Sequence, residues 1–132
     1  MKREWKINFK SNKQYWPSTY KYKWDIELCW NAWRISRISE SDSSKRKEVI
    51  VIHSISEFLE KFKRFLFVCT LAEGDYELEE DMYYFRKVDL GLGHNEYKVL
   101  ARVNQSSIEF FIFEVRKLLE ELEMLEKKYS PS

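Results

Sequence analysis

The sequence contains few of the residues that mark specialised classes of protein. Its 132 residues include two cysteines, two histidines, three glycines and two prolines. Secreted disulfide scaffolds are dense in cysteine, and fibrous or disordered chains are rich in glycine and proline. The composition therefore argues for neither. Cys29 and Cys69 lie in apolar stretches without a histidine or second cysteine at ligand spacing, so we expect core thiols, with a disulfide between them as the alternative.

The chain also lacks a long hydrophobic run and an appreciable net charge. Its longest uncharged apolar stretch, residues 65–72, is too short to cross a bilayer. The first ten residues, MKREWKINFK, alternate charged and apolar side chains, unlike a signal peptide. The net charge of +1 provides no long-range attraction for nucleic acid or for a basic protein. We expect a cytoplasmic protein without membrane association, and the oligomeric state stays open.

Apolar and aromatic residues are plentiful, at 44% and 17% of the chain. A chain of this length buries roughly two thirds of its unfolded surface in one core. We therefore interpret residues 1–132 as a single domain.

The first half of the chain shows strand patterns before a helix. One alternating apolar set comprises Trp24, Ile26, Leu28 and Trp30. The apolar parity then shifts to Trp33, which predicts a bulge or tight bend at Asn31 and Ala32. Residues 49–52 are apolar at every position, which is typical of a strand covered on both faces, so we place this strand in the middle of a sheet.

A helix is predicted after Ser54, because Ser54 and Glu57 have the spacing of a capping box. Its apolar face comprises Phe58, Leu59, Phe62, Phe65, Leu66 and Cys69. An acidic loop is expected next, over residues 73–81, followed by a strand at 82–90, a turn at 91–95, an alternating strand at 97–103 and an apolar strand at 110–113. A second helix carries an inward set of Val115, Leu118, Leu119, Leu122 and Leu125, with the acids Glu120, Glu121, Glu123 and Glu126 mostly outward.

The two halves share an order of elements. A shift of sixty residues places Ile52 on Ile112 and Glu60 on Glu120, which suggests a strand-strand-strand-helix unit repeated over residues 20–70 and 76–129. Any strand that leads into an amphipathic helix gives much of the same agreement, so duplication stays one of two interpretations. In either case the order predicts an α+β fold, with a mainly antiparallel sheet and two long amphipathic helices packed on it.

No catalytic or metal-binding constellation is visible, and we expect a protein that is not an enzyme and needs no cofactor. His53 and His94 have no nucleophile or ligand set beside them in sequence, so we interpret them as a helix-entrance residue and a turn residue. The glycines at 91 and 93 lack the third glycine of a nucleotide-binding loop. The acidic segment has no EF-hand register for calcium.

Two segments could bind a partner. Residues 1–24 combine seven lysines or arginines with the rings of Trp5, Phe9, Tyr15, Trp16, Tyr20, Tyr22 and Trp24. Cations with stacking rings suit single-stranded nucleic acid, although the alternation in residues 5–10 favours rings in the core and lysines in water. The second segment is the acidic one, and its candidate contact residues are Glu73, Asp75, Tyr76, Glu77, Glu79, Glu80 and Asp81. It can imitate the phosphates that a basic toxin surface holds.

The order of these elements resembles the small immunity proteins of bacterial polymorphic and contact-dependent toxin systems, particularly the wall-associated type. The resemblance covers roughly residues 20–128 and includes the helix SISEFLEKFKRFL, the acidic segment, the Gly93-His94 turn and the strand EYKVLARV. It implies a protein that binds and inhibits a cognate toxin domain without a cofactor. Many proteins of this kind are acidic, so the charge of +1 is a departure. The alternative is a small single-stranded nucleic-acid-binding protein or a phage-encoded anti-defence protein.

Overall fold

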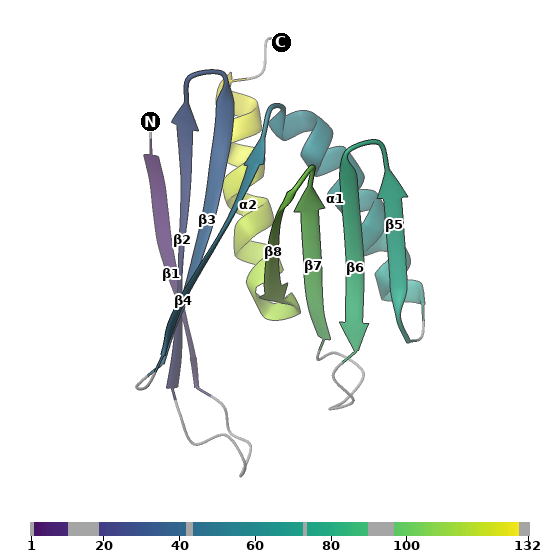
Figure 1. Cartoon of the computed structure of the whole chain (residues 1–132), viewed down its shortest axis with the longest axis horizontal. Coiled ribbons are helices and arrows are strands. Elements are labelled where there is room, and N and C mark those ends of the chain that lie inside the picture. Colours follow the sequence, from purple (N-terminus) through teal and green to yellow (C-terminus); the bar gives the residue numbers. More distant parts are fainter. Residues whose placement is uncertain (1, 11–18, 42–43, 73, 90–96, 130–132) are drawn as a thin grey trace.

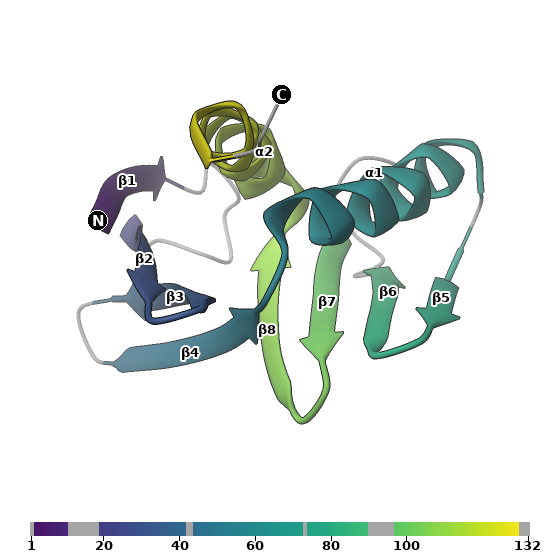
Figure 2. The ribbon, with the colours of Figure 1, turned by 90° about the horizontal axis from the view of Figure 1, so that it is seen from above.

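The computed structural model describes residues 2–10, 19–41, 44–72, 74–89 and 97–129 and shows an α+β fold. The first antiparallel sheet has the order β1-β2-β3-β4, and its strands are β1 (Lys2–Lys10), β2 (Thr19–Cys29), β3 (Ala32–Glu40) and β4 (Lys45–Ile52). The second has the order β5-β6-β7-β8, and its strands are β5 (Tyr76–Glu80), β6 (Tyr83–Asp89), β7 (Tyr97–Val103) and β8 (Ser106–Phe111). The helices α1 (Ile55–Leu71) and α2 (Ile112–Tyr129) lie on the same side of both sheets (Figures 1 and 2). The fold class is confirmed, with two sheets in place of one.

The repeated order of elements is present, with four strands before each helix where three were expected. The additional strands are β1, which precedes the expected first unit, and β5, which occupies the expected acidic loop. Gene duplication as the origin of this order stays a prediction.

Helix α1 packs against the sheet of the other half, and α2 contacts both sheets. Phe62 and Phe65 of α1 stack on Phe85 of β6, with ring centroids 5.5 Å apart in both pairs. In return, α2 contacts the first sheet, where Glu121 binds Arg3 and Tyr129 packs edge-on against Trp33. Figure 2 shows α1 above β5–β7 and α2 between the first sheet and β8. One continuous core therefore includes side chains from both halves.

The prediction of β4 as a central strand covered on both faces is wrong. β4 is the last strand of its sheet, and its burial alternates, with Ile50 and Ile52 buried and Val51 exposed. Its outer edge lies beside β8, where the Val51 amide donates to the Ser106 hydroxyl and Glu48 Oε2 accepts from the Glu109 amide. β-branched residues fill this strand at the seam between the two sheets, where side-chain hydrogen bonds join β4 to β8.

Three of the hairpins have a two-residue turn between their strands. The first of these turns shows that the predicted burial of Trp30 is wrong. Cys29 pairs with Ala32, so Trp30 and Asn31 form the turn between β2 and β3. The parity shift in the sequence is therefore a tight bend that reverses the chain. Trp30, which we expected on the buried face with Trp24 and Ile26, is 99% exposed.

The first helix agrees with its sequence pattern. The Ser54 hydroxyl accepts from the Glu57 amide at 3.1 Å, as the capping residues predict. The buried residues of α1 are Ile55, Phe58, Leu59, Phe62, Phe65 and Cys69, and Leu66 is partly buried.

The second helix begins earlier than predicted and buries two acids. The expected strand at 110–113 ends at Phe111, and α2 starts at Ile112. Glu114 then stands in the first turn, and its Oε2 accepts from the Phe111 amide at 2.8 Å, the return bond of a capping box. Glu121, expected to face mostly outward, is buried and accepts from Arg3 at 3.0 Å. Lys127 and Lys128 occupy the last turn, where positive charge suits the negative end of the helix dipole.

Neither helix of the described chain is long and apolar enough to span a membrane.

Candidate functional site

The acidic segment forms a strand, and the prediction of a loop there is wrong. Residues 76–80 are β5, the edge strand of the second sheet, which pairs with β6 on one side. Side chains alternate along it, because Glu77 and Glu79 are exposed whereas Tyr76 and Leu78 pack against the core. An edge strand presents unpaired backbone N–H and C=O groups on its outer side. We call residues 75–81 the acidic edge.

The seven candidate residues have different roles in this arrangement. Glu73 lies outside the described residues. Tyr76 stacks on Phe65, with centroids 5.6 Å apart, so its ring stabilises the junction between β5 and α1. Glu80 turns toward α1 and binds Lys61 and Arg64, each at 2.8 Å. These hydrogen bonds, with that of Lys61 the strongest, lower the pKa of Glu80. Asp75 is exposed just before β5, with its Oδ2 3.9 Å from Arg86 Nη2. Glu77, Glu79 and Asp81 are the exposed acids of β5 and its turn.

The outer face of the second sheet adds polar and aromatic groups to the acidic edge. The Tyr84 hydroxyl donates to Glu77 Oε2 at 2.6 Å, and this hydrogen bond is the largest cause of a raised pKa of Tyr84. The Arg102 guanidinium lies 4.5 Å from the centroid of the Tyr84 ring. A carboxylate, a phenol and a guanidinium thus follow one another across β5, β6 and β7. The row can exchange hydrogen bonds and a stacking contact with a protein surface.

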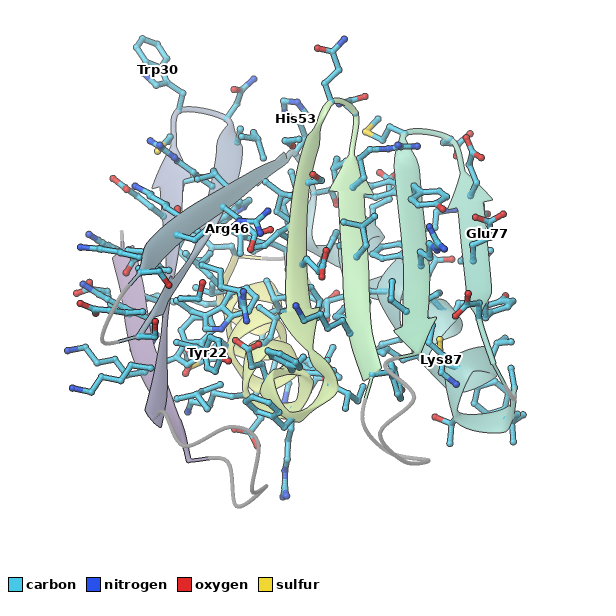
Figure 3. The ribbon with its side chains drawn as sticks, turned by 60° about the horizontal axis from the view of Figure 1, so that its bottom comes forward. Tyr22, Trp30, Arg46, His53, Glu77 and Lys87 are labelled. Atoms are coloured by element: carbon cyan, nitrogen blue, oxygen red, sulfur yellow. The ribbon has the colours of Figure 1, made fainter. Side chains whose placement is uncertain are left out.

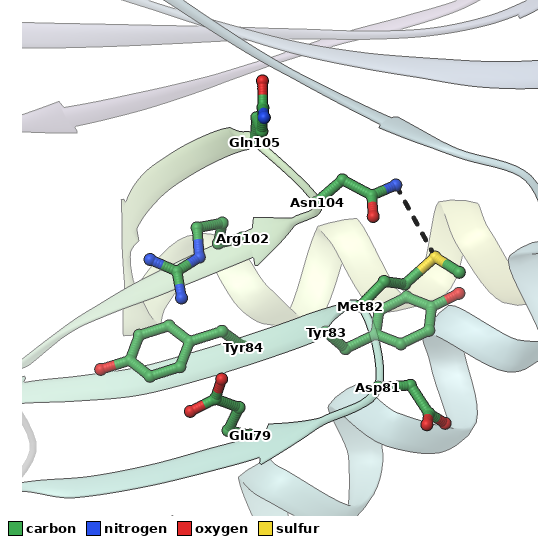
Figure 4. Close-up of a pocket in the computed structure, with 8 residues that line it drawn as sticks. All are labelled: Glu79, Asp81, Met82, Tyr83, Tyr84, Arg102, Asn104 and Gln105. Carbon is green, nitrogen blue, oxygen red and sulfur yellow. Dashed lines mark hydrogen bonds between the residues drawn. The ribbon is translucent and has the colours of Figure 1, made fainter.

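An open hollow adjoins this row at the end of β5 (Figure 4). Its lining residues are Glu79, Asp81, Met82, Tyr83, Tyr84, Arg102, Asn104 and Gln105. The backbone N–H of Asn104 donates to the backbone carbonyl of Met82 at 2.9 Å, and this hydrogen bond joins the β5–β6 turn to the β7–β8 turn. No local sequence pattern predicts this hollow, because Arg102 and Tyr84 are separated by eighteen positions and meet only through strand pairing.

The N-terminal candidate surface is largely internal where its side chains are described. Trp5, Tyr22 and Trp24 are buried, and the rings of Trp5 and Trp24 stack in parallel with centroids 5.9 Å apart. Phe9, Tyr15, Trp16 and Tyr20 lie outside the described side chains. For the three described rings, the interpretation of rings in the core and lysines in water is confirmed.

Histidine, cysteine and acidic side chains are the possible metal ligands of the chain. His53 is exposed between β4 and the cap of α1, whereas His94 and the glycine turn at 91–95 lie outside the described residues. Within the described ranges, no group of three or more His, Cys, Asp or Glu side chains is placed to hold a metal ion. Both thiols are unpaired: Cys29 is partly buried and Cys69 fully buried.

No protein-family model matches the chain, and comparison with curated protein sequences also gives no match.

Proposed function

We propose that this chain is a non-catalytic inhibitor of the immunity type, which binds a cognate bacterial toxin domain in the cytoplasm. The observation that carries the proposal is the acidic edge, where a strand that pairs on one side only within the described residues displays Glu77, Glu79 and Asp81. An extended segment of a partner can pair with such an edge through backbone hydrogen bonds while its side chains select the acids.

The charges of the acidic edge indicate which kind of toxin surface it can bind. Glu80 is already neutralised by Lys61 and Arg64, so it stabilises the position of β5. Glu77 and Glu79 share the exposed face of the strand, where their charges attract lysine or arginine side chains of a toxin. Complementary charge of this kind speeds association and fixes register more than it adds affinity. A toxin domain with a basic active-site surface fits this edge.

Coexpression with the toxin domain encoded beside the gene tests the proposal. The chain should restore growth, and the purified proteins should bind each other in calorimetry. We expect the double variant Glu77→Lys, Glu79→Lys to bind at least about tenfold more weakly, because each new lysine repels the basic partner. The matched control is Glu60→Lys, Glu120→Lys, which makes the same charge change at exposed helix positions. Persistent toxicity with every neighbouring toxin would remove the proposal.

A single-stranded nucleic-acid-binding function is the second candidate. It is supported by exposed cations of the first sheet that point away from the helices, namely Lys6, Lys21 and Lys47. Lys23 on the same face is already paired with Glu4 at 2.8 Å. An electrophoretic shift of an oligonucleotide should weaken steeply with added salt if these lysines contact phosphates. Absence of a shift at low salt would exclude it.

A further inference from the structure

Trp30 stands in a backbone conformation that disfavours it. The first residue of each two-residue hairpin turn has a positive φ, which is 55° at Asp81, 56° at Asn104 and 59° at Trp30. Asn and Asp tolerate this left-handed region, whereas a bulky residue there is strained. Two turns therefore have the residue type that the backbone favours, and the third has an indole. Burial does not compensate for the strain, because the Trp30 side chain is 99% exposed.

A chain of contacts connects the Trp30 turn to the acidic edge. Trp33 pairs with Ile52, which places His53 beside the base of the Trp30 hairpin. The hydrogen bond from Val51 to Ser106 then joins β4 to the β7–β8 turn. The hydrogen bond from Asn104 to Met82 continues from there to the β5–β6 turn.

These turns occupy one end of the molecule, with Trp30 and His53 at the same side of the view in Figure 3. We call this row the turn edge and define it by Trp30, Asn31, His53, Asp81, Met82, Asn104 and Gln105. Every one of these side chains is exposed. The row runs from the β2–β3 turn of the first sheet to the β5–β6 turn of the second. It meets the acidic edge at Asp81.

We propose that the turn edge is part of the partner surface and that Trp30 is its anchor, entering an apolar pocket on the partner protein. This inference rests on the proposed inhibitor function and extends its contact surface from β5 to the far hairpin. Tryptophan is among the residues that dominate binding energy when a partner pocket removes them from water. The strain at Trp30 is then maintained for binding, at a cost in stability.

The shape and charge of the hairpin tip select a protein pocket over other occupants. The tip projects from the molecule, so it can enter a pocket on a partner but does not form a pocket itself. The residues beside Trp30 are Cys29, Asn31 and Ala32, which carry no cation for phosphates. Stable insertion into a membrane surface takes a larger apolar area with basic flanks than one indole provides.

The test uses the purified toxin domain encoded beside the gene and three variants of the full chain. Trp30→Asn installs the residue that the equivalent β7–β8 turn contains, and it should raise the melting temperature while weakening toxin binding at least about 30-fold. Trp30→Phe retains an aromatic ring and should bind within about threefold of wild type. The matched control is Phe67→Gln, which removes an exposed aromatic residue from α1 and should bind like wild type.

Fluorine NMR of chain labelled with 5-fluorotryptophan gives a direct readout of the contact. The Trp30 signal, assigned by its loss in Trp30→Phe, should move from a solvent-exposed position when the toxin domain is added. Wild-type affinity of Trp30→Asn would overturn the inference and leave the inhibitor function intact. A wild-type chain that does not bind the toxin domain would remove both. Trp30-dependent binding of a single-stranded oligonucleotide or of phosphatidylglycerol vesicles, without toxin binding, would also overturn it.

Discussion

Arg37 of β3 donates two hydrogen bonds to the Glu114 carboxylate of α2, from Nε at 2.9 Å and from Nη2 at 2.7 Å. Glu114 has no exposed surface, and its remaining hydrogen bonds come from the Trp24 indole and the Phe111 amide. Arg37 also binds Glu48, which accepts from the Glu109 amide. This network joins the first sheet to β8 and α2. All of these groups are satisfied, as burial of a charge requires.

Removing either partner of this ion pair should destabilise the fold strongly. Arg37→Met or Glu114→Gln should lower the free energy of unfolding by about 3–5 kcal/mol, because each leaves a buried polar group without its partner. Urea denaturation measures the loss. The double variant should lose less than the sum of the two single variants, since both remove the same interaction. Arg116→Met is the control: it changes an arginine that is 93% exposed and should stay within about 0.5 kcal/mol of wild type. Equal small losses at Arg37 and Arg116 would contradict the network.

Phe62 and Leu119 should differ in their contributions to the core. Phe62 is fully buried among Phe58, Phe85 and Phe110, so Phe62→Ala should cost about 3–5 kcal/mol. Leu119 is only partly buried, so Leu119→Ala should lower the free energy of unfolding by about 2 kcal/mol or less. Denaturant melts of both variants test this ranking. An unaffected Phe62→Ala variant would show that the α1 face is assigned wrongly.

The N-terminal cap of α1 should contribute measurably to stability. Ser54→Ala removes the acceptor of the Glu57 amide and should cost about 0.5–2 kcal/mol. Ser56→Ala, two positions further on and exposed, is the matched control and should be nearly neutral. Thermal unfolding of both variants gives the comparison, and equal melting temperatures would argue against the cap.

Alkaline pH should destabilise the fold through Cys69. Burial raises the pKa of this thiol from 9.0 to about 11. Between these values the native state keeps a proton that the unfolded chain has released, so the free energy of unfolding falls as pH rises through this window. Burial also raises the pKa of Tyr83 and Tyr97, which act in the same direction. The Cys69→Ala variant should therefore decline less steeply between pH 9 and 11 than wild type. Parallel slopes in urea titrations would contradict this assignment.

Local patterns in the sequence predicted those elements whose burial follows their own periodicity. The capping residues at Ser54 and Glu57 and the alternation of Tyr97, Val99, Ala101 and Val103 are confirmed, since these four side chains of β7 are buried. Each of these signals depends on neighbours in the chain. The same reasoning predicted the buried face of α1 but not the sheet that it meets, because periodicity carries no information about the partner of a face.

The predictions that are wrong also have physical causes. Residues 49–52 are apolar, yet Val51 is exposed, because it points to the face of the sheet opposite the helices while Ile50 and Ile52 point toward the core. Trp30 continues an apolar alternation but falls in the turn, where hydrophobicity does not decide its position. Glu114 gives no sign of burial in sequence, since the groups that compensate its charge come from β2, β3 and the backbone at Phe111. Among the candidate site residues, alternation along β5 exposes Glu77 and Glu79, and the contact with Lys61 and Arg64 turns Glu80 toward α1.

The contacts of each helix with the opposite half have a consequence for synthesis on the ribosome. When the first 71 residues have emerged, β1–β4 still lack α2, and α1 has no β6 to cover. Neither half can complete its core alone, so we expect the nascent chain to remain unfolded until α2 has left the exit tunnel. Fragments cut between α1 and β5 should likewise be unstructured separately and should regain native circular dichroism only when mixed.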